Sequence, residues 1–156
     1  MAGRINGVHH IALSVPDLET ARAFYVAVLG FAEDTRGEWR KGSMIVDAVM
    51  GLEGSSGRSM LIRAGNIFLE FFEFVTPAPP PQDPDRPVSH CGYTHLALDV
   101  TDIAAVHARL EAAGMRFHTA PQTGYGVGTT YGRDPFGNVI ELQEIHEETY
   151  VKRVPL

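Results

Sequence analysis

Residues 8–18, VHHIALSVPDL, recur almost position for position as residues 93–103, YTHLALDVTDI. His10 aligns with His95 at an offset of 85 residues (95 − 10), and a helical pattern that ends at a glycine follows each copy. Internal repeats constrain the architecture of a chain more than any single motif does. Two copies are too few for a solenoid, so this repeat predicts a duplicated domain.

The composition is that of an ordinary globular domain: 156 residues, 44% of them apolar and 21% charged. The net charge is −6, and the scattered Lys and Arg residues form no basic stripe, so we expect no nucleic-acid partner. No apolar run approaches the ~20 residues of a membrane span, and the N-terminus lacks the pattern of a signal peptide. We therefore expect a cytoplasmic protein with no membrane partner. Cys91 is the only cysteine, and we interpret it as a buried or partly buried thiol.

The repeated stretch alternates with the period of two that is typical of a β-strand. In the first copy, His10 lies on the face opposite the large apolar residues and has only small neighbours there, which leaves space in front of its imidazole. His9 has the opposite parity and aligns with Thr94, so we leave it out of the candidate site. Asp17 is the expected N-cap of the helix that follows.

The closing strands of the two copies also match, because EFFE from Glu70 aligns with ELQE from Glu141. The histidine-to-glutamate separation is 60 residues in the first copy and 46 in the second, so the first copy has 14 extra residues, which we place in segment 41–58. A glutamate in an apolar strand is costly to bury unpaired, and a metal ion would offset that cost. We interpret the second glutamate of each motif, Glu73 or Glu144, as lying on the solvent face.

Each half therefore predicts the order β-α-β-β-β, with a fold of the α+β class. The expected strands and helices of the first half are strand 8–15, helix 18–28, a short strand 31–39 with a turn near Gly37, one or two helical turns at 44–50, and strands 59–64 and 67–75. Those of the second half are strand 95–100, helix 103–113, strand 115–118, a glycine-rich loop 124–128, and strands 127–133 and 139–145. We expect the two modules to form a cupped mixed sheet with the helices outside.

The domain boundaries follow from this order. The first βαβββ module spans 1–75, a proline-rich linker spans 76–91, the second module spans 92–146 and a polar C-terminal tail spans 147–156, in one structural domain overall. Segment 76–87 contains six prolines and donates few backbone hydrogen bonds, which favours an extended linker.

Four metal-type residues occupy equivalent positions in the two copies: His10, Glu70, His95 and Glu141. A single histidine or glutamate on a strand usually has a structural or solvent-exposed role. Their occurrence in both copies favours a metal site over separate structural roles, because duplication explains it only if both copies kept the residues. Two imidazoles and two carboxylates suit a divalent first-row metal.

At these motifs the chain resembles the vicinal oxygen chelate superfamily, which includes glyoxalase I, methylmalonyl-CoA epimerase, extradiol dioxygenases, and fosfomycin- and bleomycin-resistance proteins. The residues that carry the resemblance are HIALSVPDL from His10, HLALDVTD from His95, and DPFGNVIEL from Asp134. The resemblance implies paired βαβββ modules around one metal site, with His10, Glu70, His95 and Glu141 as ligands. It also implies one divalent metal ion per chain (Ni, Co, Zn, Mn or Fe) and a homodimer.

The glutamate at Glu70 resembles the second ligand of glyoxalase-I-like members, whereas epimerases commonly have glutamine there. The full His-Glu-His-Glu set favours a metal-dependent isomerase, epimerase or lyase that acts by proton transfer on a small substrate with two neighbouring oxygens. Glu141 and Glu70 are both candidates for the catalytic base. The 14 extra residues, and the lack of a glutathione-binding pattern, argue against the lactoylglutathione reaction itself.

Four further residues are candidates for substrate binding: Arg63, Phe68, Phe72 and Tyr131. Two other functions stay open. The first is an extradiol-type ring-cleaving dioxygenase, in which Glu70 would not bind the metal. The second is a small-molecule-binding or drug-resistance protein without catalysis, a role that in this superfamily usually lacks a metal.

Overall fold

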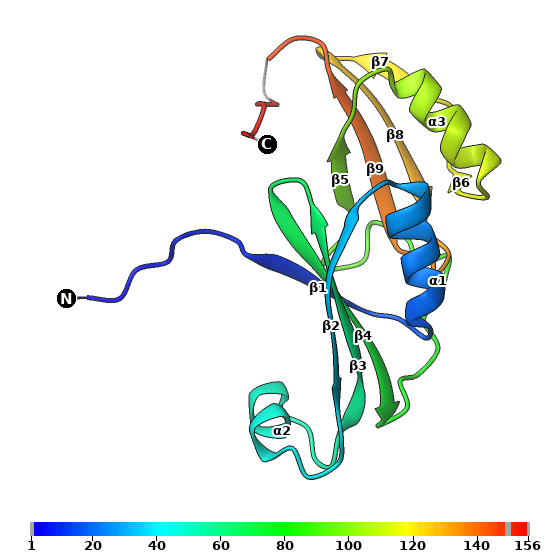
Figure 1. The fold of residues 1–156 in the computed structure, drawn as a ribbon. Coiled ribbons are helices and arrows are strands. Elements are labelled where there is room, and N and C mark those ends of the chain that lie inside the picture. The colour runs from blue at the N-terminus through cyan, green and yellow to red at the C-terminus, as the bar shows by residue number, and fades with distance from the viewer. Residues whose placement is uncertain (1, 149–150, 156) are drawn as a thin grey trace. The chain divides into compact units, whose positions relative to one another are not determined.

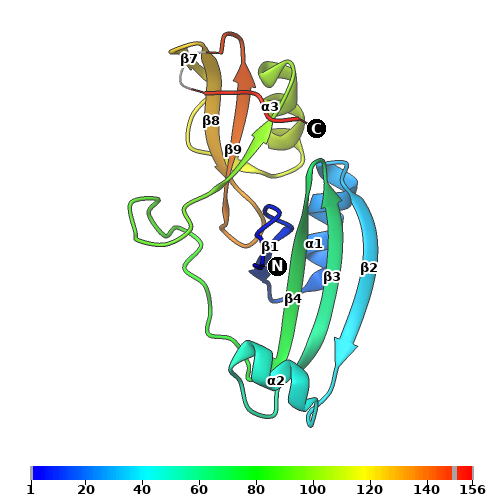
Figure 2. The same ribbon diagram turned by 90° about the vertical axis from the view of Figure 1, so that its left-hand side faces the viewer.

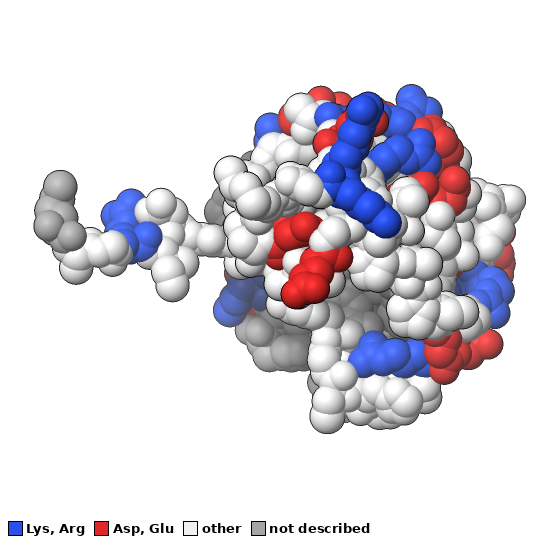
Figure 3. Space-filling model, turned by 90° about the horizontal axis from the view of Figure 1, so that it is seen from below, with Lys and Arg blue, Asp and Glu red and all other residues white. Residues whose placement is uncertain are grey.

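The computed structural model describes residues 2–148 and 151–155. The chain divides into two compact units, Met1–Pro80 and Pro81–Pro155, which we name the first and second modules. The division falls inside the proline-rich segment. Among the described residues, no helix combines the length and apolar character of a transmembrane segment. On the face shown in Figure 3, Lys and Arg side chains are interspersed with Asp and Glu.

The first module is a four-stranded mixed sheet with a helix across one face (Figure 1). Its elements are β1 (His10–Ser14), α1 (Leu18–Arg22), η1 (Ala23–Val28), β2 (Ala32–Trp39), α2 (Met44–Met50), β3 (Ser56–Ala64) and β4 (Ile67–Thr76). The strand order is β1-β4-β3-β2, with β1 parallel to β4 and the other pairs antiparallel. The predicted turn near Gly37 is wrong, because Gly37 pairs with Ser59 inside the β2–β3 ladder, with its neighbours paired on both sides.

The core of the first module lies between the sheet and the helix α1–η1, in which η1 is a π-helix. Leu69 and Phe71 of β4 are fully buried there, and the ring of Phe71 lies 4.6 Å from the ring of Tyr25 in η1. Each such side chain contributes roughly 1.5–3 kcal/mol by leaving water. The alternate β4 residues, including Glu70 and Phe72, are only partly buried. The strand therefore has two distinct faces, and we name the one opposite α1–η1 the helix-free face.

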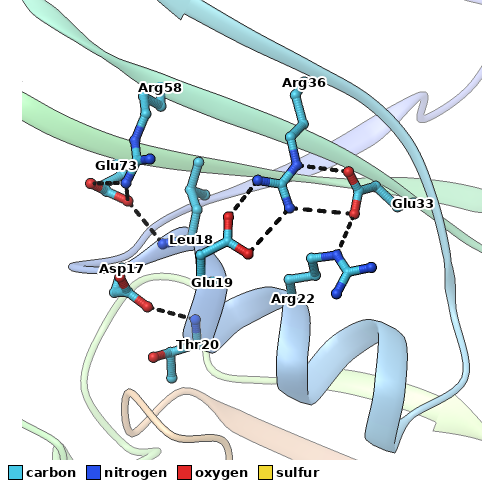
Figure 4. A network of polar contacts seen from close by, with 9 residues as sticks. All are labelled: Asp17, Leu18, Glu19, Thr20, Arg22, Glu33, Arg36, Arg58 and Glu73. Carbon is cyan, nitrogen blue, oxygen red and sulfur yellow. Dashed lines mark hydrogen bonds and ion pairs between the residues drawn. The ribbon is translucent and has the colours of Figure 1, made fainter.

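The N-terminus of α1 is capped twice (Figure 4). Asp17 accepts a hydrogen bond from the Thr20 backbone N–H at 2.6 Å, which confirms the predicted N-cap. Glu73 of β4 accepts one from the Leu18 N–H at 2.9 Å and is also paired with Arg58 at 2.7 Å. The predicted solvent position of Glu73 is therefore wrong, because its carboxylate satisfies a helix N–H that has no partner within the helix.

The second module is a five-stranded mixed sheet with one helix. Its elements are β5 (Leu96–Asp99), α3 (Ile103–Ala112), β6 (Arg116–Phe117), β7 (Gln122–Gly124), β8 (Val127–Arg133) and β9 (Val139–Ile145). The order is β5-β9-β8-β6, and β7 also pairs with β8. The predicted glycine-rich loop is partly wrong. Because β6 pairs with only the end of β8, the backbone of β7 supplies the hydrogen bonds that complete that edge. The predicted α+β class and the two βαβββ modules are confirmed.

The second module repeats the capping arrangement of the first. Asp102 accepts a hydrogen bond from the Ala105 N–H at 3.1 Å. Glu144 accepts hydrogen bonds from the N–H groups of Asp102 at 2.7 Å and Ile103 at 3.2 Å. The predicted solvent position of Glu144 is wrong for the same reason as that of Glu73.

Two further predictions concern residues outside the sheets. Cys91 is exposed, so the expected buried thiol is wrong: the residue lies in an irregular segment whose carbonyls accept hydrogen bonds from Arg86. The predicted tail 147–156 includes residues 149, 150 and 156, which lie outside the described residues. Within the tail, Arg153 donates a hydrogen bond to the Ile145 carbonyl.

Candidate metal centre

The first predicted pair of metal-type residues lies together on the helix-free face of the first module. Ala12 of β1 is the register partner of Glu70 in the parallel strand β4, and His10 lies two residues earlier on the same face. The imidazole therefore reaches the carboxylate diagonally, with His10 Nε2 3.2 Å from Glu70 Oε2. The two side chains are 42% and 25% exposed, which leaves both accessible to a ligand.

The second predicted pair has the same geometry in the second module. Ala97 of β5 is the register partner of Glu141 in β9, as Ala12 is of Glu70. His95 Nε2 lies 3.1 Å from Glu141 Oε2, and the two side chains are 27% and 15% exposed. The duplication has thus preserved the strand, the register and the facing atoms, as well as the residue types.

The other ring nitrogen of each histidine contacts the side chain of the residue before it. His10 Nδ1 lies 2.9 Å from His9 Nδ1, and His95 Nδ1 lies 2.8 Å from Thr94 Oγ1. His9, which strand parity left out of the candidate site, nevertheless contacts the predicted ligand His10 directly. A partner at one ring nitrogen orients a ligating imidazole and presents the other nitrogen to a metal. Both histidines thus present Nε2 toward their glutamates.

The surroundings of the two glutamates differ. In the second module, the Thr129 hydroxyl donates to Glu141 Oε1 at 2.6 Å, and Tyr131 stands opposite Glu141 in the ladder. The Tyr131 hydroxyl lies 3.4 Å from His95 Nε2. Burial raises the pKa of the Tyr131 phenol, and the Glu141 carboxylate raises it further. The phenol therefore keeps its proton at neutral pH.

In the first module, Leu61 occupies the ladder position opposite Glu70. This residue has no hydroxyl, so the cross-strand neighbour of Glu70 cannot donate as Tyr131 can. Glu70 and Glu141 therefore occupy equivalent positions in the two modules, but their neighbouring side chains differ.

Each module thus supplies one imidazole and one carboxylate. No group of three or more His, Cys, Asp or Glu side chains suited to a metal occurs within residues 2–148 and 151–155. The chemistry of the combined donor set, two imidazoles and two carboxylates, fits a divalent first-row metal. A four-ligand centre needs both pairs and stays a prediction.

Three of the predicted substrate-binding residues lie on the helix-free face of the first module. The Arg63 guanidinium lies 4.3 Å from the centroid of the Phe68 ring and 3.9 Å from Asp34 Oδ1. Phe68 also stacks on His9 at 5.2 Å, so it lies beside the first pair. Phe72, two residues beyond Glu70, contacts other aromatic rings. The fourth candidate, Tyr131, lies beside the second pair.

Sequence reasoning missed Trp39 at this face. Its indole lies 5.9 Å from the Phe72 ring and 5.3 Å from the Phe74 ring, between centroids. Trp39 is the only tryptophan of the chain, and it is the last residue of the strand that precedes segment 41–58. The position of a large aromatic residue between a strand and the extra segment was the signal that could have identified Trp39 from the sequence.

The sequence profile of the Glyoxalase/Bleomycin resistance protein/Dioxygenase superfamily matches residues 7–142. Together with two βαβββ modules, this match defines the class: the chain belongs to that superfamily, and the predicted resemblance is confirmed.

Three known proteins illustrate the relationship. The uncharacterized protein YaeR of Escherichia coli (strain K12) is 32% identical over 144 residues, which cover 88% of this chain and 95% of YaeR. The 2-epi-5-epi-valiolone epimerase of Actinomyces sp. is 34% identical over 124 residues, or 74% of this chain and 64% of that protein. A glyoxalase family protein from Bacillus cereus superposes with a TM-score of 0.83 at 21% identity, over 93% of this chain and 97% of that one, which supports the fold alone.

Proposed function

We propose that this protein is a metal-dependent isomerase, epimerase or lyase that moves a proton on a small substrate with two neighbouring oxygens. The observation that carries the proposal is the repeated imidazole–carboxylate pair, with separations of 3.2 Å and 3.1 Å at equivalent register in the two modules. The relative named as an epimerase favours epimerisation among these reactions. As in many members of the superfamily, we expect a homodimer.

In the proposed centre, His10, Glu70, His95 and Glu141 hold one divalent cation (Ni, Co, Zn, Mn or Fe). The contacts of His9 and Thr94 at Nδ1 orient the imidazoles for ligation through Nε2. A bound cation supplies Lewis-acid stabilisation of negative charge on the substrate oxygens.

A glutamate at the edge of this centre takes the proton from the substrate carbon and returns it. Glu141 and Glu70 are both candidates for this base, and the difference in their surroundings supports Glu70. Tyr131 stands opposite Glu141 in the ladder and the Thr129 hydroxyl donates to Glu141 at 2.6 Å, whereas the residue opposite Glu70 is Leu61. A carboxylate that must swing between substrate carbons works best with few fixed hydrogen bonds. Tyr131, whose raised pKa keeps the phenol protonated, would donate a hydrogen bond to a substrate oxygen.

Elemental analysis tests the metal centre. We expect about one divalent metal per chain after EDTA treatment and reloading, and a loss of that metal in both His10→Ala and His95→Ala. His90→Ala is the matched control, because His90 is exposed and lies in the irregular segment before β5. If only one of the two variants lost the metal and the other kept it, the result would contradict a centre shared by the two modules.

Deuterium incorporation tests the chemistry. The reloaded protein is incubated in D₂O with α-hydroxyketones, which carry neighbouring oxygens and an acidic C–H bond. NMR should show exchange at that carbon in the wild type and at least a hundredfold slower exchange in Glu70→Gln, within the range for loss of a general base. Oxygen consumption with Fe(II), without proton exchange, would instead support ring cleavage.

A further inference from the structure

Trp39, Phe72 and Phe74 form a group of three contacting rings on the helix-free face, which we name the aromatic corner. Their ring centroids lie 5.3–5.9 Å apart, and the two contacts of Trp39 are edge-to-face. All three side chains are partly buried, whereas Leu69 and Phe71 on the opposite face of β4 are fully buried. The aromatic corner is therefore separate from the hydrophobic core beneath α1–η1.

The sheet is built to let the indole lie across it. Trp39 in β2, Gly57 in β3 and Phe74 in β4 are register partners across three adjacent strands. Gly57 has no side chain, and a Cβ atom there would lie 2.5 Å from Trp39 Cη2. The missing side chain leaves the gap through which the indole reaches Phe74.

Segment 41–58 of the first module, which holds the 14 extra residues and which we name the inserted segment, fixes the indole in this position. The Trp39 indole N–H donates to the Ser55 hydroxyl at 2.9 Å, and that hydroxyl donates to the Asp47 carboxylate. Asp47, in α2, also accepts the N–H groups of Gly54 at 3.0 Å and Ser55 at 2.9 Å. Figure 2 shows α2 at the end of the sheet formed by β2, β3 and β4. Because the only polar atom of the indole is satisfied by Ser55, the ring presents apolar surface to the helix-free face.

The aromatic corner continues directly from the first His–Glu pair. Glu70, Phe72 and Phe74 alternate along one face of β4, so Phe72 lies about 7 Å from Glu70 and Phe74 about twice as far. We propose that the aromatic corner binds a planar ring of the substrate, and that the inserted segment serves as a specificity element. This inference rests on the proposed function, since it places the ring beside chelating oxygens held at His10 and Glu70.

The test compares two 2-hydroxy acids on the metal-loaded protein. Mandelate and lactate carry the same neighbouring oxygens, and they differ in having a phenyl or a methyl group. We expect isothermal titration calorimetry to give mandelate at least about tenfold higher affinity, because the phenyl ring buries more apolar area and packs against aromatic rings. Mandelate, unlike lactate, should also change the fluorescence of Trp39, the only tryptophan.

Variants assign the preference to the aromatic corner. Trp39→Leu should reduce the mandelate-to-lactate ratio to about threefold or less while lactate affinity stays unchanged, because the indole contacts Phe72, the ring of the aromatic corner nearest to Glu70. Ser55→Ala should lower the ratio and shift the Trp39 emission, because Ser55 is a positioning residue for the indole. Ile45→Ala is the control within the inserted segment, since the Ile45 side chain is 80% exposed on α2. Circular dichroism checks that each variant is folded.

The outcomes separate this inference from the proposed function. Equal affinities for the two acids, a ratio that survives Trp39→Leu, or binding of lactate without binding of mandelate would overturn the aromatic corner as a ring site. If metal strengthens the binding of neither acid but mandelate still perturbs Trp39, the metal-dependent function fails and the ring site stands.

Discussion

At the scale of single residues, the second glutamate of each closing strand stabilises a helix. Glu73 bonds the Leu18 N–H at 2.9 Å and Arg58 at 2.7 Å, and its side chain is 17% exposed. We expect Glu73→Gln to destabilise the first module by about 1.5–3 kcal/mol, the range for a hydrogen bond to a charged group. The measurement is urea unfolding followed by Trp39 fluorescence.

Glu38→Gln is the control for this loss. The Glu38 side chain is 64% exposed and its ion pair is an exposed one with Arg40 at 3.0 Å, so the change should stay within about 0.5 kcal/mol. Equal urea midpoints for the two variants would show that the Glu73 cap does not contribute measurably to the stability of the first module.

Glu144 gives the corresponding pH dependence in the second module. Hydrogen bonds from the Asp102 and Ile103 N–H groups, and then His146, lower the pKa of Glu144. A lowered folded-state pKa means that the stabilisation is present above the unfolded pKa and is lost as the pH falls through the folded one. The wild type should therefore be more stable than Glu144→Gln at pH 7, and the difference should shrink below about pH 4. Thermal unfolding between pH 3 and 7 measures it, and a difference that stays constant would contradict the assignment.

At the scale of elements, the turn between β8 and β9 depends on a glycine. Gly137 has φ +89°, and a Cβ atom there would lie 2.3 Å from Pro84 Cα. Gly137→Ala combines left-handed strain with a backbone clash, so we expect a loss of at least about 2 kcal/mol. Gly124→Ala is the matched control, since its Cβ would meet nothing within 4 Å. Calorimetric unfolding of both variants measures the loss, and similar transition temperatures would contradict it.

The repeat also explains which elements and site residues could be predicted. The two His–Glu pairs were predictable because both copies keep the same residue types at the same strand positions. Glu73 and Glu144 recur just as regularly, three residues after Glu70 and Glu141. Strand alternation places them on the face opposite the metal-type residues. It does not reveal that a helix begins there with unsatisfied N–H groups.

The rest was hidden because it depends on contacts between elements. Trp39 acquires its position from Ser55 and Gly57, which lie in the segment where no regular pattern is present. The strand β7 exists because the short β6 leaves part of β8 without hydrogen-bond partners. Neither the position of Trp39 nor the formation of β7 leaves a periodic pattern in the local sequence. Strand alternation and helical spacing therefore could not reveal them.

At the scale of the whole molecule, a metal shared between the modules would couple their stabilities. In the proposed centre, the first module would supply His10 and Glu70 and the second would supply His95 and Glu141. The sole tryptophan, Trp39, lies in the first module and reports its unfolding. Free metal at 100 times its dissociation constant stabilises the state that binds it by about 2.7 kcal/mol. We therefore expect added metal to raise the urea midpoint seen by Trp39 fluorescence.

The variant His95→Ala makes this a test of coupling, because it removes a ligand from the module that lacks the fluorophore. We expect it to abolish the metal-induced shift of the Trp39 transition while leaving the metal-free midpoint nearly unchanged. His90→Ala, which alters an exposed histidine of the same module, should keep the full shift. If His95→Ala keeps it as well, His95 is not a ligand of the metal that stabilises the first module.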